Sequence, residues 1–390
     1  MDRRELLKSG LVLTAGVVTA GLSGCTKNVT EEKYDDFNSS PIPPAQKEKY
    51  KITTSMPFNI DLIDEMAEMN KNYKKSEIVS LYNNIPNPLF SEFDDFFASQ
   101  RGKNENIKSY DDYAKYVKHA KDKGFKIVYL LNSPKPLSRN NFEKYRKKFN
   151  NLLDFIHDIG CDDIKVANTQ VATLVNESKY NFKLSASTSF EYHNTLQYVN
   201  LVRNYPNIET FDIAIDENRN FPFLANLKKL FPDKNIEVIV NEPCVQGCPA
   251  RISHASSMFC VYNCSKIRNI TTDICRTGII YPWNFAYYQN VGVSSFKILG
   301  FPVRSLISNL YYLRSYLDLI EFGVDNIKTI PKEIFPYKIR FREDISLREL
   351  ISYLPDIRHF IKNGDKCASK CKAECNYCYE CAEKIKELLV

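Results

Sequence analysis

The sequence predicts an α/β fold, a (β/α)8 TIM-like barrel with a short cysteine-rich helical C-terminal extension. Runs of four to six apolar or β-branched residues, typical of buried strands, alternate with helical patterns eight times over about 270 residues. The 390 residues are 44% hydrophobic, 13% aromatic and 26% charged, which suffices for one large core and excludes a disordered chain. An open doubly wound sheet is the alternative.

The strand–helix units follow one another along the chain, with a long loop after the second strand and a cysteine-rich segment after the seventh. The expected strands are Lys51–Met56, Glu77–Leu81, Lys126–Leu131, Asp163–Ala167, Lys183–Ala186, Thr210–Ile213, Asn235–Val240 and Ser295–Ile298. The helices that follow the first six strands and the eighth are expected at Asp61–Met69, Ser109–Lys123, Asn140–Ile159, Thr169–Val175, Glu191–Tyr205, Phe221–Phe231 and Arg304–Phe322. Gly124, Gly160 and Gly292 stand between a helix and the next strand, where a left-handed cap ends the helix.

Charge and hydropathy exclude two classes of protein. The formal net charge is only +6, and Lys and Arg are interspersed with Asp and Glu, so we expect no nucleic-acid partner. The one continuous apolar or small stretch, Gly10–Gly24, is 15 residues long. That length is too short to span a bilayer, so the chain is not a polytopic membrane protein.

The first 25 residues have the composition of an export signal. Arg3 and Arg4 lie in a charged start, and a short, weakly apolar run leads to small residues before Cys25. Asp2–Lys8 resembles a twin-arginine signal, which exports folded proteins. Leu22–Cys25 resembles a lipobox, in which the cysteine is lipidated. The alternative is an ordinary N-terminal helix.

These patterns predict four segments. Residues 1–24 are a signal peptide, 25–49 a flexible tether, 50–330 the barrel and 331–390 the C-terminal extension. We therefore expect an exported lipoprotein that a lipid on Cys25 anchors to a membrane. Its place would be the periplasmic or outer face of the cytoplasmic membrane, or the outer membrane.

Polar residues follow the apolar strands at the end of the barrel where active sites form. Arg219, with carboxylates just before it, is a candidate for binding an anionic group. Lys297 lies inside the last strand, facing either outward or toward the mouth. The residues at the strand ends are Tyr82, Asn132, Asn168, Ser187, Thr188, Glu217, Asn218, Arg219, Asn241 and Glu242.

Ten of the twelve cysteines form two groups. The upstream group is Cys244, Cys248, Cys260, Cys264 and Cys275, and the tail group is Cys367, Cys371, Cys375, Cys378 and Cys381. Disulfides suit an exported protein, but five is odd and the spacings are too short for unstrained bridges. Thiols this close bind zinc or an iron–sulfur cluster. The pairs in the upstream group fit zinc, whereas their place directly after the seventh strand favours iron–sulfur.

The tail group has a geometry of its own. If Cys367–Cys381 is helical, all five thiols fall within an arc of about 120°. Such a face favours a second metal site over a cysteine-rich packing stripe. The tail then binds an iron–sulfur cluster or zinc by itself, or it completes the mouth site from across the barrel rim.

Two stretches resemble the U32 peptidases, a collagenase-like family of unknown catalytic type. Val240–His254 contains Asn-Glu-Pro-Cys-x-x-x-Cys-Pro, and Asp273–Arg276 is followed by Tyr281–Tyr288 and Gly292–Ile298. Ile164–Asn168 and Leu184–Thr188 resemble the middle strands of the same family. The resemblance covers about residues 50–330.

The resemblance implies a barrel with a [4Fe–4S] cluster and, in several members, oxygen-independent hydroxylation; other members are named peptidases. It implies Cys244, Cys248 and Cys275 as ligands, with Cys264 or Cys260 as the fourth. The partners would then be a small-molecule substrate and an electron donor. The candidate catalytic residues are Asn241, Glu242, His254 and Arg219. The alternative functions are a peptidase and a non-catalytic metal-binding surface lipoprotein.

Overall fold

The computed structural model describes residues 44–83, 107–136, 138–161, 163–242, 244–253, 274–299, 306–331, 334–335, 339–369 and 375–389. All of them belong to one compact unit, Ile42–Val390. The proposed signal peptide, Cys25, Cys260, Cys264, Cys371 and His254 lie outside these residues. Within the described residues, no helix has the length and apolar character needed to cross a membrane.

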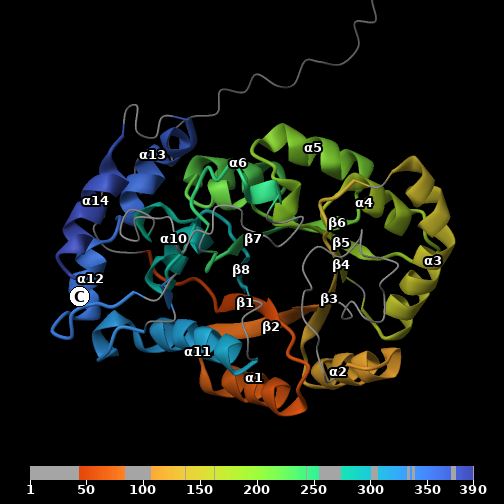
Figure 1. Cartoon of the computed structure of the whole chain (residues 1–390), viewed down its shortest axis with the longest axis horizontal. Helices are drawn as coiled ribbons and strands as arrows, with labels where there is room; N and C mark the ends of the chain where they lie inside the picture. The colour runs from red at the N-terminus through yellow and green to blue at the C-terminus, as the bar shows by residue number, and fades with distance from the viewer. Residues whose placement is uncertain are drawn as a thin grey trace, which may run out of the picture. The chain divides into compact units, whose positions relative to one another are not determined.

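Eight parallel strands close into a barrel in chain order, which confirms the predicted (β/α)8 fold (Figure 1). The strand β8 pairs with β1, so the sheet has no edge, and the alternative of an open sheet is wrong. The strands are β1 Tyr50–Ser55, β2 Ser76–Asn83, β3 Lys126–Leu131, β4 Asp163–Val166, β5 Lys183–Ala186, β6 Ile208–Asp212, β7 Asn235–Ile239 and β8 Ser295–Ile298.

Helices surround the strands, and side-chain caps begin several of them (Figure 1). They are α1 Ile60–Asn72, α2 Tyr110–Asp122, α3 Arg139–Asp158, α4 Thr169–Asn176, α5 Thr195–Asn204, α6 Phe221–Leu230, α10 Phe285–Asn290 and α11 Leu306–Phe322. Four short 3-10 helices are η4 Thr188–Phe190, η5 Ile215–Glu217, η6 Pro282–Asn284 and η7 Val324–Asn326. The three inter-element glycines have positive φ, as the sequence predicts.

One barrel helix is shorter than the sequence predicts. The expected helix Glu191–Tyr205 begins only at Thr195, because Asn194 caps it with a capping box. Glu191 itself has φ 49°, the only positive φ at a non-glycine residue in the described chain. A left-handed backbone cannot continue a right-handed helix, so residues 191–194 form a loop at the barrel mouth.

The C-terminal extension forms three helices, α12 Leu347–Tyr353, α13 Ile357–Ser369 and α14 Tyr377–Lys386, gathered on one side of the barrel (Figure 1). Cys367–Cys381 is not one continuous helix, so the condition on which all five thiols would share a narrow arc is not met. Cys367 lies on α13 and Cys375 precedes α14, while Cys378 and Cys381 lie on α14. The tail thiols therefore do not share one helix face.

Four charged side chains meet inside the barrel. Lys165 Nζ contacts Asp212 (2.6 Å) and Glu237 (2.7 Å), and Lys297 Nζ contacts Asp212 (3.0 Å). These residues come from β4, β6, β7 and β8, so their contacts cross the lumen. All four are at most 4% exposed, which makes two cations and two carboxylates a buried, balanced set.

Attraction between the two lysines and the two carboxylates in the lumen favours their ionised forms, although burial opposes ionisation. Burial raises the pKa of Asp212. For Glu237 burial acts in the same direction, but the Lys165 and Lys297 ammonium groups prevail and hold its pKa well below its usual range. Burial likewise opposes charge on Lys297, yet Asp212 and Glu237 raise its pKa. Lys297 therefore faces the lumen rather than the outer helices.

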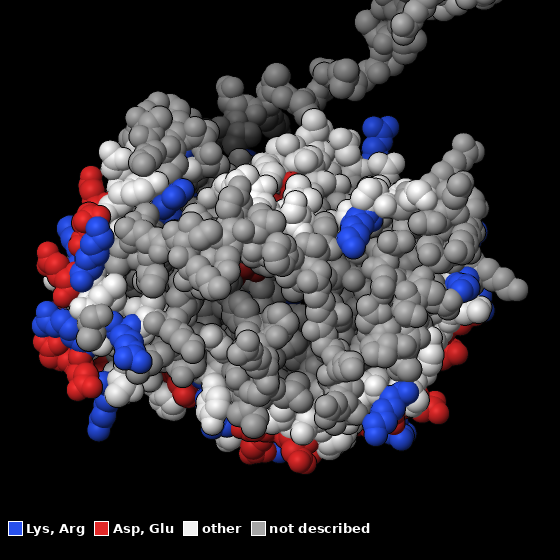
Figure 2. Space-filling view, viewed as in Figure 1, with Lys and Arg blue, Asp and Glu red and all other residues white. Residues whose placement is uncertain are grey.

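The charged side chains of the outer surface are mixed in sign and lie toward the margin of the face in Figure 2.

Candidate functional site

Three of the cysteines implied as ligands lie on one short ribbon beyond the C-terminal end of β7. Val245 pairs with Thr277 in an antiparallel bridge. Gln246 N donates to Arg276 O (3.0 Å) and Gly278 N to Cys244 O (3.3 Å). These contacts set residues 276–278 beside residues 244–246, and Cys275 immediately precedes the paired segment. We call residues 244–248 with 274–278 the thiol ribbon.

The thiol ribbon is largely shielded from water. Cys244 is 8% exposed and Cys275 is fully buried. Burial raises the pKa of both thiols well above the usual value, and the Glu242 carboxylate raises that of Cys244 further. In the unliganded chain both sulfurs thus keep their protons, which makes them poor nucleophiles. A metal that replaced the protons would find soft sulfur donors.

The thiols of the ribbon are soft donors of the kind that bind zinc or iron–sulfur clusters. Among the described residues, no three His, Cys, Asp or Glu side chains come close enough to hold a single metal ion. The fourth ligand that the family resemblance implies, Cys264 or Cys260, lies outside them. In the tail, Cys375 Sγ lies 3.6 Å from His359 Nε2.

Arg219 binds the protein rather than open solvent. It is 5% exposed, and its Nη1 donates to Cys275 O (2.8 Å). The same nitrogen lies 3.9 Å from Cys378 Sγ, and the guanidinium sits 4.3 Å from the ring centre of Phe360. Arg219 therefore joins the thiol ribbon to the C-terminal extension.

Asn241 and Glu242 hold the entry to the thiol ribbon. The Asn241 side chain donates to Leu299 O (2.9 Å) and accepts from Leu299 N (2.7 Å), which ties the end of β7 to the end of β8. Glu242 Oε1 accepts from Cys244 N (3.3 Å). In this structure both residues position the ribbon.

Other polar residues at the strand ends also bind backbone. Asn168 caps α4 by accepting from Val171 N (2.9 Å) and donates to Ser133 O (2.8 Å). Asn218 Nδ2 donates to Ile239 O (2.9 Å) and Gly278 O (2.8 Å). These contacts shape the mouth and leave fewer groups to meet a substrate than the sequence predicts.

A histidine–carboxylate pair at the mouth escaped the sequence analysis. His193, which follows β5, places Nδ1 3.1 Å from Glu217 Oε1, and Glu217 is almost fully buried after β6. Asn220 Nδ2 donates to the other Glu217 oxygen (2.7 Å). The hydrogen bond to Glu217 raises the pKa of His193 against the opposing effect of burial. An oriented imidazole of this kind can take up and release a proton near neutral pH.

The pair is linked to the thiol ribbon through Asp216. Asp216 Oδ1 accepts from Gly247 N (2.9 Å) and from Arg251 Nη2 (2.6 Å). Arg251 Nε faces the Glu191 carboxylate at 4.0 Å, and burial raises the pKa of Glu191. Glu191 holds the strained backbone noted above, a feature that clusters at functional sites. Proton-active groups and thiols thus share one end of the barrel.

Residues 91–205 match the model of Peptidase family U32. An uncharacterized protease of Methanocaldococcus jannaschii is 20% identical over 348 residues, which cover 85% of this chain and 95% of the relative. These two matches support membership of the U32 family. The thiol ribbon lies beyond the residues that match the family model.

Two solved structures match about two thirds of this chain at low identity. A U32 peptidase of known structure covers 68% of this chain and 98% of its own, with 12% identity and a TM-score of 0.44. A GH113 β-1,4-mannanase covers 65% of this chain and 88% of its own, with 13% identity and a TM-score of 0.36.

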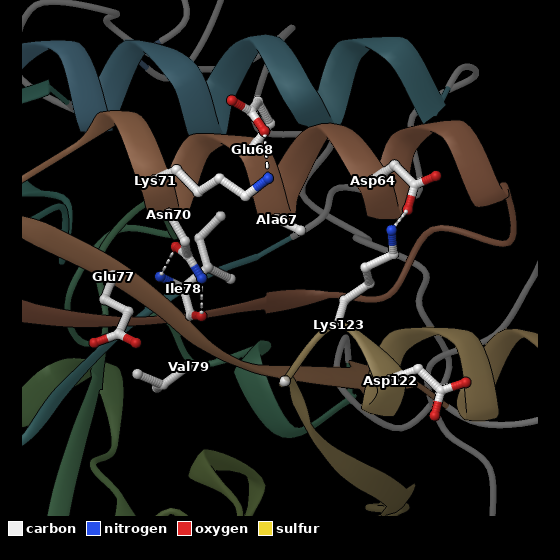
Figure 3. Close-up of a pocket in the computed structure, with 11 residues that line it drawn as sticks. Asp64, Ala67, Glu68, Asn70, Lys71, Glu77, Ile78, Val79, Asp122 and Lys123 are labelled. Carbon is white, nitrogen blue, oxygen red and sulfur yellow. Dashed lines mark hydrogen bonds and ion pairs between the residues drawn. The ribbon is translucent and has the colours of Figure 1, made fainter.

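A polar pocket of about 690 Å³ lies away from the mouth, between α1, the start of β2 and the turn before β3 (Figure 3). Its polar side chains are engaged with one another. Asp64 accepts from Lys123 (2.7 Å), Glu68 pairs with Lys71 (2.8 Å), and Asn70 exchanges two hydrogen bonds with the backbone of Ile78. Since active sites of such barrels lie at the opposite end, we assign the chemistry to the mouth.

Proposed function

We propose that this U32-like chain is an iron–sulfur enzyme that carries out oxygen-independent redox chemistry, such as hydroxylation, on a small organic substrate at the barrel mouth. The observation that carries the proposal is the thiol ribbon, in which the segment with Cys244 and Cys248 pairs through its backbone with the segment that follows Cys275, beyond β7. A [4Fe–4S] cluster there would supply electron transfer or a Lewis-acidic iron.

The histidine–carboxylate pair supports an enzyme over a non-catalytic scaffold. A structural metal site has no need of an imidazole held by Glu217 and tied through Asp216 to the same ribbon. In the proposed reaction His193 moves protons to and from the substrate, and Glu217 orients the ring. Burial shields Cys244 and Cys275 from water on this side of the mouth.

Anaerobic purification with iron and acid-labile sulfide analysis tests the proposal. We expect both elements and a visible absorbance that bleaches on reduction. Cys244→Ser, Cys248→Ser and Cys275→Ser should each lose iron, and Cys161→Ala, a buried cysteine near α3, should keep it. Stoichiometric zinc without sulfide would instead support a scaffold, with zinc as the structural metal.

Peptide hydrolysis is the second candidate, because the family is named for peptidases and the His193–Glu217 pair could activate water. Incubation of the purified chain with gelatin and casein tests it. Hydrolysis that disappears in His193→Asn and persists in Cys244→Ser would support a peptidase. Its absence in an iron-loaded preparation would leave the redox function as the better supported one.

We also propose that the chain is exported by the twin-arginine route and anchored through a lipid on Cys25. Export in the folded state suits a cluster that is assembled inside the cell. An enzyme anchored in this way could receive electrons from a donor at the membrane surface.

A further inference from the structure

The C-terminal extension packs tightly on the rim of the barrel beside the thiol ribbon. A Cβ at Gly364, on α13, would lie 2.3 Å from Arg219 O, so helix and rim touch backbone to backbone. The Arg219 guanidinium stacks on Phe360 of α13. Arg276 of the ribbon lies 5.3 Å from the ring centre of Tyr379 on α14. The thiol ribbon therefore contacts α14 through Arg276.

This packing brings tail thiols to Cys275. The Arg219 nitrogen that binds Cys275 O also contacts Cys378 Sγ. Cys378 and Cys381 are three residues apart on α14 and so share a helix face. The Cys275 carbonyl and the Cys378 sulfur therefore lie within 2.8 Å and 3.9 Å of one Arg219 nitrogen, and Cys381 lies on the same face of α14 as Cys378. Cys244 has Cys248 and Glu242 as its corresponding neighbours.

These contacts group Cys275 with thiols of the tail rather than with the cysteines nearest to it in the sequence. Resting on the proposed function, we propose that Cys378 or Cys381 is the fourth ligand of the iron–sulfur cluster that Cys275 binds, so that the C-terminal extension is part of the barrel's metal site. A cluster spreads its ligand sulfurs more widely than a single ion does, which suits neighbouring thiols that do not surround one point. Arg219 would offset the negative charge of the thiolates.

Metal analysis of the full-length chain tests this grouping. After anaerobic reconstitution with iron and sulfide, Cys275→Ser and one of the two variants Cys378→Ser and Cys381→Ser should each lose most of the iron bound by the unmodified chain. Cys161→Ala, which lies in the core away from the ribbon, should retain it. Full iron in Cys378→Ser and Cys381→Ser, together with loss in Cys275→Ser, would overturn the grouping and leave the proposed function standing. No iron or sulfide in the unmodified chain would instead contradict the proposed function.

A second measurement does not depend on metal loading. Mild oxidation of the metal-free chain, followed by peptide mapping, should yield a disulfide from Cys275 to Cys378 or Cys381. Disulfides formed only within the upstream group and only within the tail would overturn the grouping, whatever the iron content.

Discussion

The sequence context of four charged residues in the strands indicates that they face the lumen of the barrel. Lys165, Asp212, Glu237 and Lys297 each stand between two apolar residues of a strand. Since side chains alternate between the faces of a strand, such a triplet in four strands predicts that the charged residues share the lumen. That signal was available in the sequence, but it becomes decisive only when the closed barrel brings the four strands around one centre.

Lys165 should be essential for stability. We expect Lys165→Met to lower the free energy of unfolding by about 3–5 kcal/mol, because it strips a buried contact from two carboxylates. Lys183→Met is the matched control on the neighbouring strand, where the lysine pairs with Glu209 at the surface, and should cost far less. Urea unfolding of both variants measures the difference. Equal losses would mean that the lumen contacts contribute no more than a surface ion pair.

His193 should titrate above the usual histidine midpoint of about 6.5. In Glu217→Gln the midpoint should fall, since the hydrogen-bonded carboxylate is the largest cause of the raised pKa. A raised pKa in the folded state stabilises the protein at pH values below the usual midpoint, and the benefit is lost as pH rises through the folded pKa. The stability difference between the unmodified chain and Glu217→Gln should therefore shrink from acid to alkaline pH.

Proton NMR of the imidazole and urea unfolding at several pH values check this prediction. Gln197→Ala, which alters contacts with the backbone at His193 but not with the ring, is the control. An unchanged midpoint in Glu217→Gln would contradict the pairing.

At the scale of elements, the sequence locates the barrel well and its mouth less well. All eight expected strands lie within two residues of the observed ones at each end, because apolar runs and flanking glycines are local signals. The helix at 191–205 was placed too early, since a strained left-handed residue leaves no mark in periodicity. The contact of Arg219 with Cys378 on α14 joins positions 159 residues apart and depends on tertiary packing, which the cysteine spacing does not encode.

The seam between α13 and the barrel rim should be sensitive to one methyl group. In Gly364→Ala the new Cβ would collide with the backbone of Arg219 and Asn220, so we expect a loss of about 1–3 kcal/mol in unfolding free energy. Ser352→Ala, on the exposed face of α12, is the control and should change little. Thermal unfolding compares them. A stabilised Gly364→Ala, as expected for alanine in an isolated helix, would show that the extension does not rest on the rim.

On the scale of the whole molecule, barrel and extension share the mouth. The barrel supplies the thiol ribbon and the His193–Glu217 pair, and the extension supplies Phe360 and α14 around Arg219. A site built from segments so far apart in sequence exists only after the chain has folded. This places a constraint on how a metal-loaded protein could reach the outside of a cell.

That constraint leads to a prediction about export. If the proposed cluster is loaded inside the cell, a site assembled from distant segments has to cross the membrane folded, and the twin-arginine route carries folded proteins. We expect Arg3→Lys combined with Arg4→Lys to leave a full-length precursor inside the cell, whereas Cys25→Ala should be exported without lipid. Cell fractionation and the mass of the N-terminal peptide measure both results. Export of the arginine double variant at the level of the unmodified chain would contradict the twin-arginine assignment and would direct attention to a route that threads unfolded chains, in which case the cluster would have to be assembled after export.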